Sequence, residues 1–501
     1  MKPRGKFSIR IARWHACAHR SALVWLAFIG TGLAALSVAV LRRGMIHPEA
    51  YSFLPHYLGD RSLAAKVFDV GKTDWSLYNG RELSYFFDFL DCRFIAWSID
   101  HGWPHFLSAC HYVFLGLTCA AMVWFARQRL RLPRLAAALL ALLFLTTPAV
   151  FLGGSYFRSA KQGVTLCLLL SACTVAPAFA SRDRSRRFPW PAWAGTIGAA
   201  SMMGFFDRQG FFLILLLGFA LLIRAVVARD RDGLIWLCAA AAPAALVAWY
   251  NRQLGPALIE HFNGHRPSFA FQELPWNELT NRETLFNVLF YAPQLMLDNL
   301  RFLLGDIPLL LAGLVLVAGV IALGPRWPWP ASTSEPPPPK WRRLAGVAAA
   351  ASLPLALAGM DGVMILRMKA VIGLDLRRLY YGLPSMGVFW ILASLAVAAL
   401  WRHCRVRAQA IWLALFVLVA SNAVALVEHR AIIRLGLYRD FYRTSPALIS
   451  ALSNMDQLPL QPPGAPLTPL GWLPEGSSPA RDPLIHFFQE RRLKRMAQPP
   501  R

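Results

Sequence analysis

The apolar run LAAALLALLFLTTPAVFLGG, residues 135–154, decides the fold class of this 501-residue chain. It is apolar on every face of a helix, and a helix of about 20 residues spans the hydrocarbon core of a bilayer. A membrane-spanning strand would instead be shorter and would alternate between apolar and polar residues. Similar runs recur along the chain, which is 56% hydrophobic and contains 18 tryptophans. The sequence therefore predicts an all-α, polytopic membrane protein.

Basic residues separate these apolar runs. The formal net charge is +25, but the arginines lie in short clusters between the runs and accompany no nucleic-acid-binding motif. The three clearest clusters span residues 127–134, 182–187 and 402–407. Basic loops stay on the cytoplasmic side of a membrane, so the charge indicates orientation in a lipid bilayer and not a nucleic-acid partner.

The two signals together predict about eleven transmembrane helices, with the N-terminus in the cytoplasm and the C-terminus in the periplasm. The expected spans are 22–41, 105–125, 135–153, 162–180, 191–206, 210–227, 233–250, 300–324, 344–359, 384–401 and 408–427. A basic cytoplasmic N-terminus (1–21) precedes the membrane domain (22–427), and an extramembrane tail (428–501) follows it. The long outer loops of the membrane domain are 42–104, 251–299 and 360–383.

The first outer loop is unusually acidic. It holds eight of the chain's 27 acidic residues: Glu49, Asp60, Asp69, Asp74, Glu82, Asp88, Asp91 and Asp100. Apolar periodicity from residue 81 to about residue 99 predicts an amphipathic helix on the membrane surface, with its acids at the water boundary. Asp88 and Asp91 stand three apart and share a helical face, where two like charges raise one pKa or recruit a cation. The alternative is a solvated face paired with neighbouring arginines.

Cations also occur in outer loops, where the charge rule disfavours them. An Arg fork matches phosphate oxygens bidentately, so these cations are candidates to bind a lipid phosphate. Pairing with the acidic loop, or snorkelling to lipid headgroups, is the alternative. The candidate substrate-binding residues are Arg81, Arg158, Lys161, Asp207, Arg208, Gln209, Arg377, Arg378 and Tyr380. Among them, Asp207 is expected to pair with a neighbour, and Gln209 adds a neutral donor and acceptor.

Several motifs are absent from the sequence. It contains no GxxxxGK[ST], HExxH or GxSxG, which disfavours a P-loop nucleotide hydrolase, a zinc membrane protease and a serine hydrolase. The eight cysteines form no CxxC pair, so neither a disulfide framework nor a zinc site is indicated. No cofactor is identified, and a divalent cation stays open.

The layout of the chain resembles the GT-C superfamily of integral-membrane glycosyltransferases. The resemblance combines an uncleaved first span, an acid-rich first outer loop with a surface helix, an odd number of spans, a second outer loop midway and RRLYYGLP (377–384) before a late span. It is closest to the bacterial members that take sugars from polyprenyl phosphates. Members typically keep an essential Asp or Asp-Glu pair in the first outer loop. Here TDW, RELS and FDFLD are each able to hold it, but no adjacent Asp-Glu pair and no DxD occurs there.

The resemblance implies a multi-pass enzyme of the bacterial inner (plasma) membrane that transfers a sugar from a polyprenyl-phosphate donor to an acceptor at the periplasmic face. Such a reaction needs a carboxylate to take the acceptor proton, and cations to stabilise the leaving phosphate. The candidate catalytic residues are Asp74, Glu82, Asp88 and Asp91. Two alternatives are a transporter or flippase of lipid-linked or amphiphilic cargo, and a non-catalytic membrane assembly subunit. The sequence leaves the oligomeric state undetermined.

Overall fold

A computed structural model of the chain describes most residues between 50 and 269 and shorter parts elsewhere. The described residues are 30, 32–36, 50–69, 77–78, 80–147, 150, 159–179, 188–228, 231–266, 268–269, 282, 286, 290, 382–403, 415, 418–420, 422–423, 448–455 and 483–497. The expected spans at 300–324 and 344–359 lie outside these residues, as do most of those at 22–41 and 408–427.

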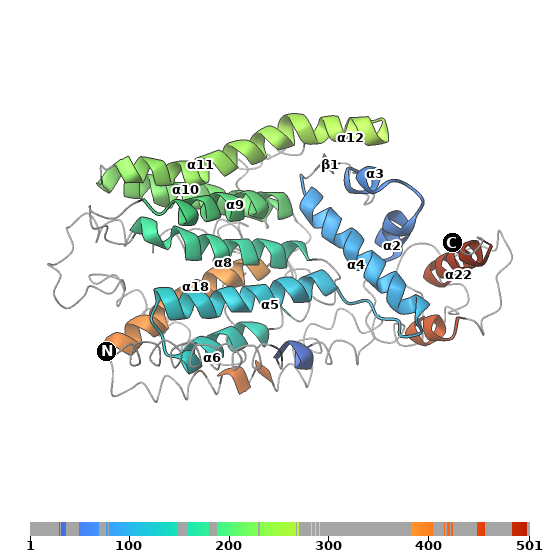
Figure 1. The fold of residues 1–501 in the computed structure, drawn as a ribbon, viewed down its shortest axis with the longest axis horizontal. Helices are drawn as coiled ribbons and strands as arrows, with labels where there is room; N and C mark the ends of the chain where they lie inside the picture. The colour runs from blue at the N-terminus through green and yellow to red at the C-terminus, as the bar shows by residue number, and fades with distance from the viewer. Residues whose placement is uncertain are drawn as a thin grey trace, which may run out of the picture.

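A bundle of long helices forms the body of the molecule (Figure 1). Its members are α5 (Ala109–Trp124), α6 (Arg134–Leu145), α8 (Ala160–Phe179), α9 (Trp190–Phe206), α10 (Arg208–Ala228), α11 (Arg231–Trp249) and α18 (Leu383–His403). Two π-helical turns, η1 (Phe125–Arg129) and η2 (Tyr250–Leu254), continue α5 and α11. The indole of Trp390 on α18 donates to the carbonyl oxygen of Leu140 on α6 at 2.9 Å, which fixes α18 inside the bundle.

Four helices in the described part are long and apolar enough to cross a membrane, judged by length and composition. They span Ala109–Arg129, Ala160–Phe179, Arg208–Val226 and Arg231–Asn263. Each coincides with a span expected from the sequence, so the prediction of a helical, membrane-type fold is confirmed there. The total of about eleven spans, the orientation of the termini and the division at residues 22 and 427 stay predictions.

At one end of the bundle lies α4 (Glu82–Asp100), the helix predicted in the first outer loop. Figure 1 shows α4 crossing this end obliquely, with other short helices beyond it. These are α2 (Ala50–Leu58), α3 (Leu63–Val67) and, from the chain's C-terminal part, α22 (Pro483–Met496). The helix α12 (Gly255–Asn263) extends α11 past the same end. Two short strands, β1 (Leu77–Tyr78) and β2 (Ser268–Phe269), pair in parallel there.

The helix α4 has two packed sides, which corrects the expectation that Glu82, Asp88 and Asp91 lie in water. Near its N-terminus, Phe87 stacks on Phe206 of α9, with ring centroids 5.7 Å apart. Farther along, Ile95 is buried in a cluster with Phe53 of α2 and Phe488 of α22. Because the helix is covered on both sides, its three acids other than the exposed Asp100 are buried. The relative exposures are 8% for Glu82, 1% for Asp88 and 0% for Asp91.

The opposite end of the bundle carries Arg129, which the sequence assigns to the cytoplasmic side, and Arg224, which lies within the expected span 210–227. The Nη2 of Arg129 donates to the carbonyl oxygen of Cys173 at 3.0 Å. Likewise, the Nε of Arg224 donates to the carbonyl oxygen of Ala178 at 2.7 Å. Both carbonyls lie in the C-terminal part of α8. That of Cys173 is free because Pro177, four residues later, has no N–H, and that of Ala178 lies in the last turn, where a cation also meets the negative end of the helix dipole. The two arginines therefore cap free carbonyls at this end of α8.

Candidate functional site

The corner between α9 and α10 is built on Asp207. Its backbone is extended, with φ −165° and ψ 160°, so it separates two helices that otherwise follow each other directly. The carboxylate Oδ1 accepts from the backbone amide of Gln209 at 3.1 Å, which caps the N-terminus of α10. Since Asp207 is only 3% exposed, this carboxylate lies inside the protein and needs compensation for its charge.

Two cations from other parts of the chain supply that compensation. The Nζ of Lys161, near the start of α8, lies 2.7 Å from Oδ1 of Asp207. The Nη1 of Arg81, the residue that precedes α4, lies 3.4 Å from Oδ2. All three side chains are buried. We call this set, Arg81, Lys161 and Asp207, the Asp207 corner.

The electrostatics of the corner favour an ionised carboxylate. Burial by itself raises the pKa of Asp207, but the charges of Lys161 and Arg81 oppose it. Hydrogen bonds from Lys161 and from the Gln209 amide act in the same direction as these charges. The net result is a pKa well below the ordinary value of 3.8. Two cations then share one anion, so the three groups carry a net positive charge.

Local backbone chemistry holds Arg81 in place. Gly80 has φ +56°, a conformation that side-chain-bearing residues rarely adopt, and a Cβ there would lie 1.7 Å from Oδ1 of Asn251. Asn251, in η2, is 5% exposed and donates to the carbonyl oxygen of Val247 at 2.8 Å. The end of α11 therefore lies against the residue before Arg81, and only glycine fits between them.

A neutral polar contact beside the corner was not predicted from the sequence. The Nε2 of Gln162, next to Lys161 on α8, donates to the hydroxyl of Thr118 on α5 at 2.6 Å. Both side chains are fully buried, and the Oε1 of Gln162 has no hydrogen-bond partner in the described part. A single amide inside an apolar run is the sequence signal that identifies such a position.

Asp91 has a different role. Its Oδ1 accepts from the backbone amide of Cys110 at 2.9 Å, and its Oδ2 accepts from the hydroxyl of Ser108. Ser108 is itself the N-cap of α5 and accepts from the amide of His111 at 3.0 Å. Asp91 therefore joins α4 to the N-terminus of α5. Burial raises its pKa from 3.8 to about 7, although the hydrogen bonds from Cys110 and Ser108 lower it.

The structure thus groups part of the predicted set. It brings together Arg81, Lys161 and Asp207, with Arg208 and Gln209 following Asp207 at the start of α10. Asp88 and Asp91 share a helix, as predicted, and both raise the pKa of Cys92, the residue after Asp91, after the larger effect of burial. The candidates outside the described residues are Asp74, Arg158, Arg377, Arg378 and Tyr380. Within the described residues, no three His, Cys, Asp or Glu side chains are grouped as metal ligands.

No protein-family model matches the chain, and no curated protein matches it. Among solved structures, the chain is similar to ArnT from Cupriavidus metallidurans, crystallised bound to undecaprenyl phosphate. The two chains are 15% identical with a TM-score of 0.41, and the match covers 92% of this chain and 84% of that one. We draw no residue correspondence from a likeness at this level.

Proposed function

We propose that the protein is a membrane glycosyltransferase that moves a sugar from a polyprenyl-phosphate donor to an acceptor at the periplasmic face. The observation that carries this proposal is the ion pair between Arg81 and Asp207. It joins the start of the acidic helix α4 to the bundle end that holds Lys161. Acidic and basic residues that are far apart in the sequence therefore meet at one place. Sugar transfer needs both kinds of group: a general base for the acceptor proton and cations for the phosphate leaving group.

The position of the corner in the bundle supports a periplasmic reaction. The helices α8 and α10 begin at the Asp207 corner, and α9 and α11 end there. The arginines that cap α8 lie at the opposite ends of these helices. Because basic loops stay in the cytoplasm, the capped end faces the cytoplasm and the Asp207 corner faces the periplasm.

The cations of the corner suit a phosphate leaving group. Asp207 holds Lys161 and Arg81 in place before any ligand binds. Cations fixed in advance stabilise a developing negative charge without further reorganisation. Under this proposal Lys161 and Arg81 contact the donor phosphate, with Arg208 beside them, and Asp207 positions both cations.

We rank the candidate bases by their burial and their contacts. Asp91 is fully buried and is engaged by the N-terminus of α5, so we assign it a structural role. Glu82 directly follows Arg81 in the chain and keeps an exposed fraction of 8%. We therefore propose Glu82 as the general base in the described part of the loop, with Asp74 as the competing candidate and Asp88 third.

A transfer assay tests the proposal. The full chain, reconstituted in lipid nanodiscs, is given a panel of polyprenyl-phosphate sugars carrying a labelled hexose or pentose together with a panel of hydroxyl- and amine-bearing acceptors, and transfer of label from donor to acceptor is measured. We expect donor turnover by the wild type. Glu82→Gln should reduce it by about 100-fold or more, the usual contribution of a general base. Glu260→Gln, which changes an exposed acid of α12, should have no effect.

Three outcomes decide between the hypotheses. Full turnover by Glu82→Gln together with loss in Asp74→Asn would move the base to Asp74. Full turnover in the Glu82, Asp74 and Asp88 variants would contradict a base in the first outer loop. A folded wild type that consumes no donor, but moves the labelled lipid across the bilayer, would contradict the transferase and support a flippase.

A further inference from the structure

The helix that contains α11, η2 and α12 is longer than a membrane is thick. It runs from Arg231 to Asn263, 33 residues, or about 50 Å at 1.5 Å per residue. The hydrocarbon core of a bilayer is only about 30 Å thick. Figure 1 shows α12 extending past the ends of the neighbouring bundle helices. The outer part of this helix therefore projects beyond the hydrocarbon core, where it meets the first outer loop.

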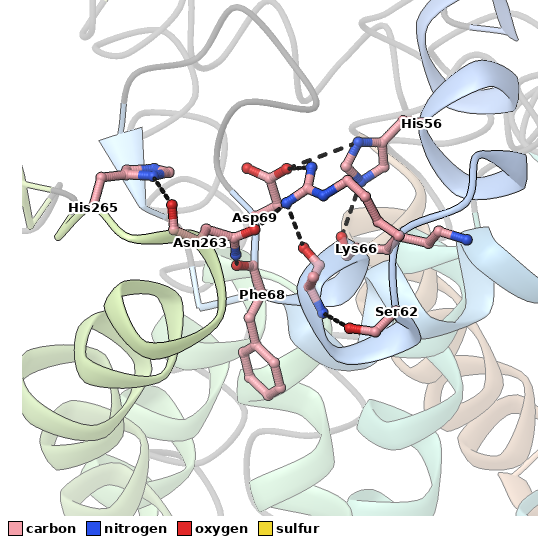
Figure 2. Close-up of polar contacts among 9 residues, drawn as sticks. His56, Ser62, Lys66, Phe68, Asp69, Asn263 and His265 are labelled. Atoms are coloured by element: carbon pink, nitrogen blue, oxygen red, sulfur yellow. Dashed lines mark hydrogen bonds and ion pairs between the residues drawn. The ribbon is translucent and has the colours of Figure 1, made fainter.

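The outer end of this helix is joined to the first outer loop by one side-chain amide (Figure 2). The Nδ2 of Asn263 donates to the carbonyl oxygen of Phe68, and its Oδ1 accepts from Nη2 of Arg61. Arg61 also donates from Nη1 to Asp69 at 2.6 Å, which fixes the guanidinium on the loop. The ring of Phe68 stacks on that of Phe262, with centroids 5.7 Å apart. Because Asn263 uses both its donor and its acceptor, an apolar side chain at this position would lose both bonds.

The inner end of the same contact is Asn251, in the π-helical turn η2. Such turns are rare and often occur at functional sites. The Nδ2 of Asn251 donates to the carbonyl oxygen of Val247 in its own helix at 2.8 Å, which fixes the orientation of the side chain. Its Oδ1 lies so close to Gly80 that a Cβ there would approach it to 1.7 Å. Asn263 follows twelve positions later, about 18 Å along the helix, so the loop is held at two separate points.

The strand β1 lies between these two points in the sequence of the loop. It pairs in parallel with β2, which follows α12 in the chain. The described parts of the loop are therefore attached to one stretch of chain three times, first at Phe68, then at β1 and last at Gly80. Arg81 comes directly after the third attachment.

The start of α4 depends on this attachment because it has no side-chain cap of its own. Arg81 occupies the N-cap position and makes no capping hydrogen bond. An arginine side chain offers only donors, whereas an N-cap needs an acceptor. Tertiary contacts must then fix the first residue of the helix, and the contact between Asn251 and Gly80 is adjacent to it. It places the Nη1 of Arg81 3.4 Å from Oδ2 of Asp207.

We propose that Asn251 and Asn263 are positioning residues of the Asp207 corner. They hold the loop at Gly80 and Phe68, and thereby set where Arg81 meets Asp207. The consequence for sugar transfer rests on the proposed function, whereas the positioning of Arg81 does not. Both asparagines act through Arg81, and a displacement of about 1 Å in a group that contacts the substrate costs up to about 100-fold in rate.

Thermal unfolding of the full chain in nanodiscs tests the positioning of Arg81 independently of activity. Arg81→Met should lower the Tm of the wild type, because Asp207 loses one of its two cations. In Asn251→Ala the same change should lower Tm by about half as much or less, since Arg81 is no longer held against the carboxylate. Asn263→Ala should act in the same direction, and it leaves α11 and η2 unaltered if Asn251→Ala does not fold.

An exposed asparagine provides the matched control. The Nδ2 of Asn454 donates to the carbonyl oxygen of Ser450, four residues earlier, at 3.0 Å, which is the same local bond that Asn251 makes with Val247. Asn454→Ala should leave the effect of Arg81→Met on Tm unchanged.

The transfer assay then measures the consequence for the reaction. Asn251→Ala should reduce turnover about tenfold or more. It should cause no further loss in an Arg81→Met background, because the group through which it acts is already gone. An asparagine with a merely structural role would give losses that add.

Three outcomes decide the proposal. Equal Tm losses from Arg81→Met in the wild type and in both asparagine variants would overturn it. Losses of turnover that add in the double variant would also overturn it, while leaving the transferase in place. A wild type with the expected Tm pattern but no turnover would support the positioning of Arg81 and contradict the proposed function.

Discussion

Asp207 and Asp91 are buried carboxylates at the same end of the bundle, yet their surroundings shift their pKa values in opposite directions. Asp207 lies between two cations, and its pKa falls well below 3.8. Asp91 accepts only from a hydroxyl and an amide, and its pKa rises to about 7. Burial is nearly equal, at 3% and 0% exposure, so the charge of the partners decides the protonation state. One carboxylate belongs to a charged site and the other to a helix cap.

Replacement of Asp207 should give the largest effect. Asp207→Ala leaves Lys161 and Arg81 buried without their shared anion, and it removes the cap of α10. Breaking a buried ion pair from one side costs about 3–5 kcal/mol, so we expect a loss of this size in the free energy of unfolding in detergent. The double variant Asp207→Ala, Lys161→Met should recover part of it, because one unpaired charge is gone. A loss below about 1 kcal/mol would contradict the ion-paired corner.

The contributions of the two carboxylates to the stability of the protein should change with pH in opposite directions. Asp91 has a raised folded-state pKa, so its contribution to stability is present below pH 3.8 and is lost as the pH rises through about 7. Asp207 has a lowered pKa, so its contribution is present above pH 3.8 and is lost as the pH falls below that value. At 1.36 kcal/mol per pH unit, the Asp91 effect is at most about 4 kcal/mol.

Denaturant unfolding between pH 4 and pH 8 measures this difference. The free energy of unfolding of the wild type, taken relative to Asp91→Asn, should fall as the pH rises through that range. The same comparison against Asp207→Asn should be flat there. A flat difference for Asp91 would mean that the carboxylate is already ionised at pH 4, held so by the donors and the positive end of α5.

Much of the fold follows from the sequence, because apolar length is a local property. The helices α5, α8, α10 and α11 coincide with runs that the sequence identifies as spans. The position of α4 follows from its apolar periodicity. Its burial does not, since α22, which covers one side, lies nearly 400 residues away in the chain.

The site is predictable to a smaller extent. The sequence places Arg81, Lys161 and Asp207 in one candidate set and expects Asp207 to pair with a neighbour. It does not indicate that the partner is Lys161 on another helix, because that depends on how α8 packs against α9. The capping role of Asp91 is also tertiary, although a serine directly before an apolar run, Ser108, is a readable helix-start signal.

Truncation of Asp91 should cost less than truncation of Asp207. Asp91→Ala removes the acceptor for the Cys110 amide and the Ser108 hydroxyl without leaving any charge unpaired. Loss of a helix-capping acceptor costs about 0.5–2 kcal/mol, which we expect in the free energy of unfolding at pH 4, where the carboxyl group is neutral in the folded protein. A cost as large as that of Asp207→Ala would mean that Asp91 compensates a cation, and the contrast between the two carboxylates would be lost.

The isosteric change Asp91→Asn should have the smallest effect, and it tests the protonation state most directly. A carboxylic acid with a pKa of about 7 is neutral at pH 4, and Asn reproduces its shape with one carbonyl acceptor. That acceptor can keep the bond from the Cys110 amide, so we expect a change in unfolding free energy at pH 4 below about 1 kcal/mol. Asp207→Asn should destabilise far more, because an amide cannot balance Lys161 and Arg81. Both variants replace a carboxylate with an amide of the same shape. Equal losses of unfolding free energy would therefore show that charge does not distinguish the two positions.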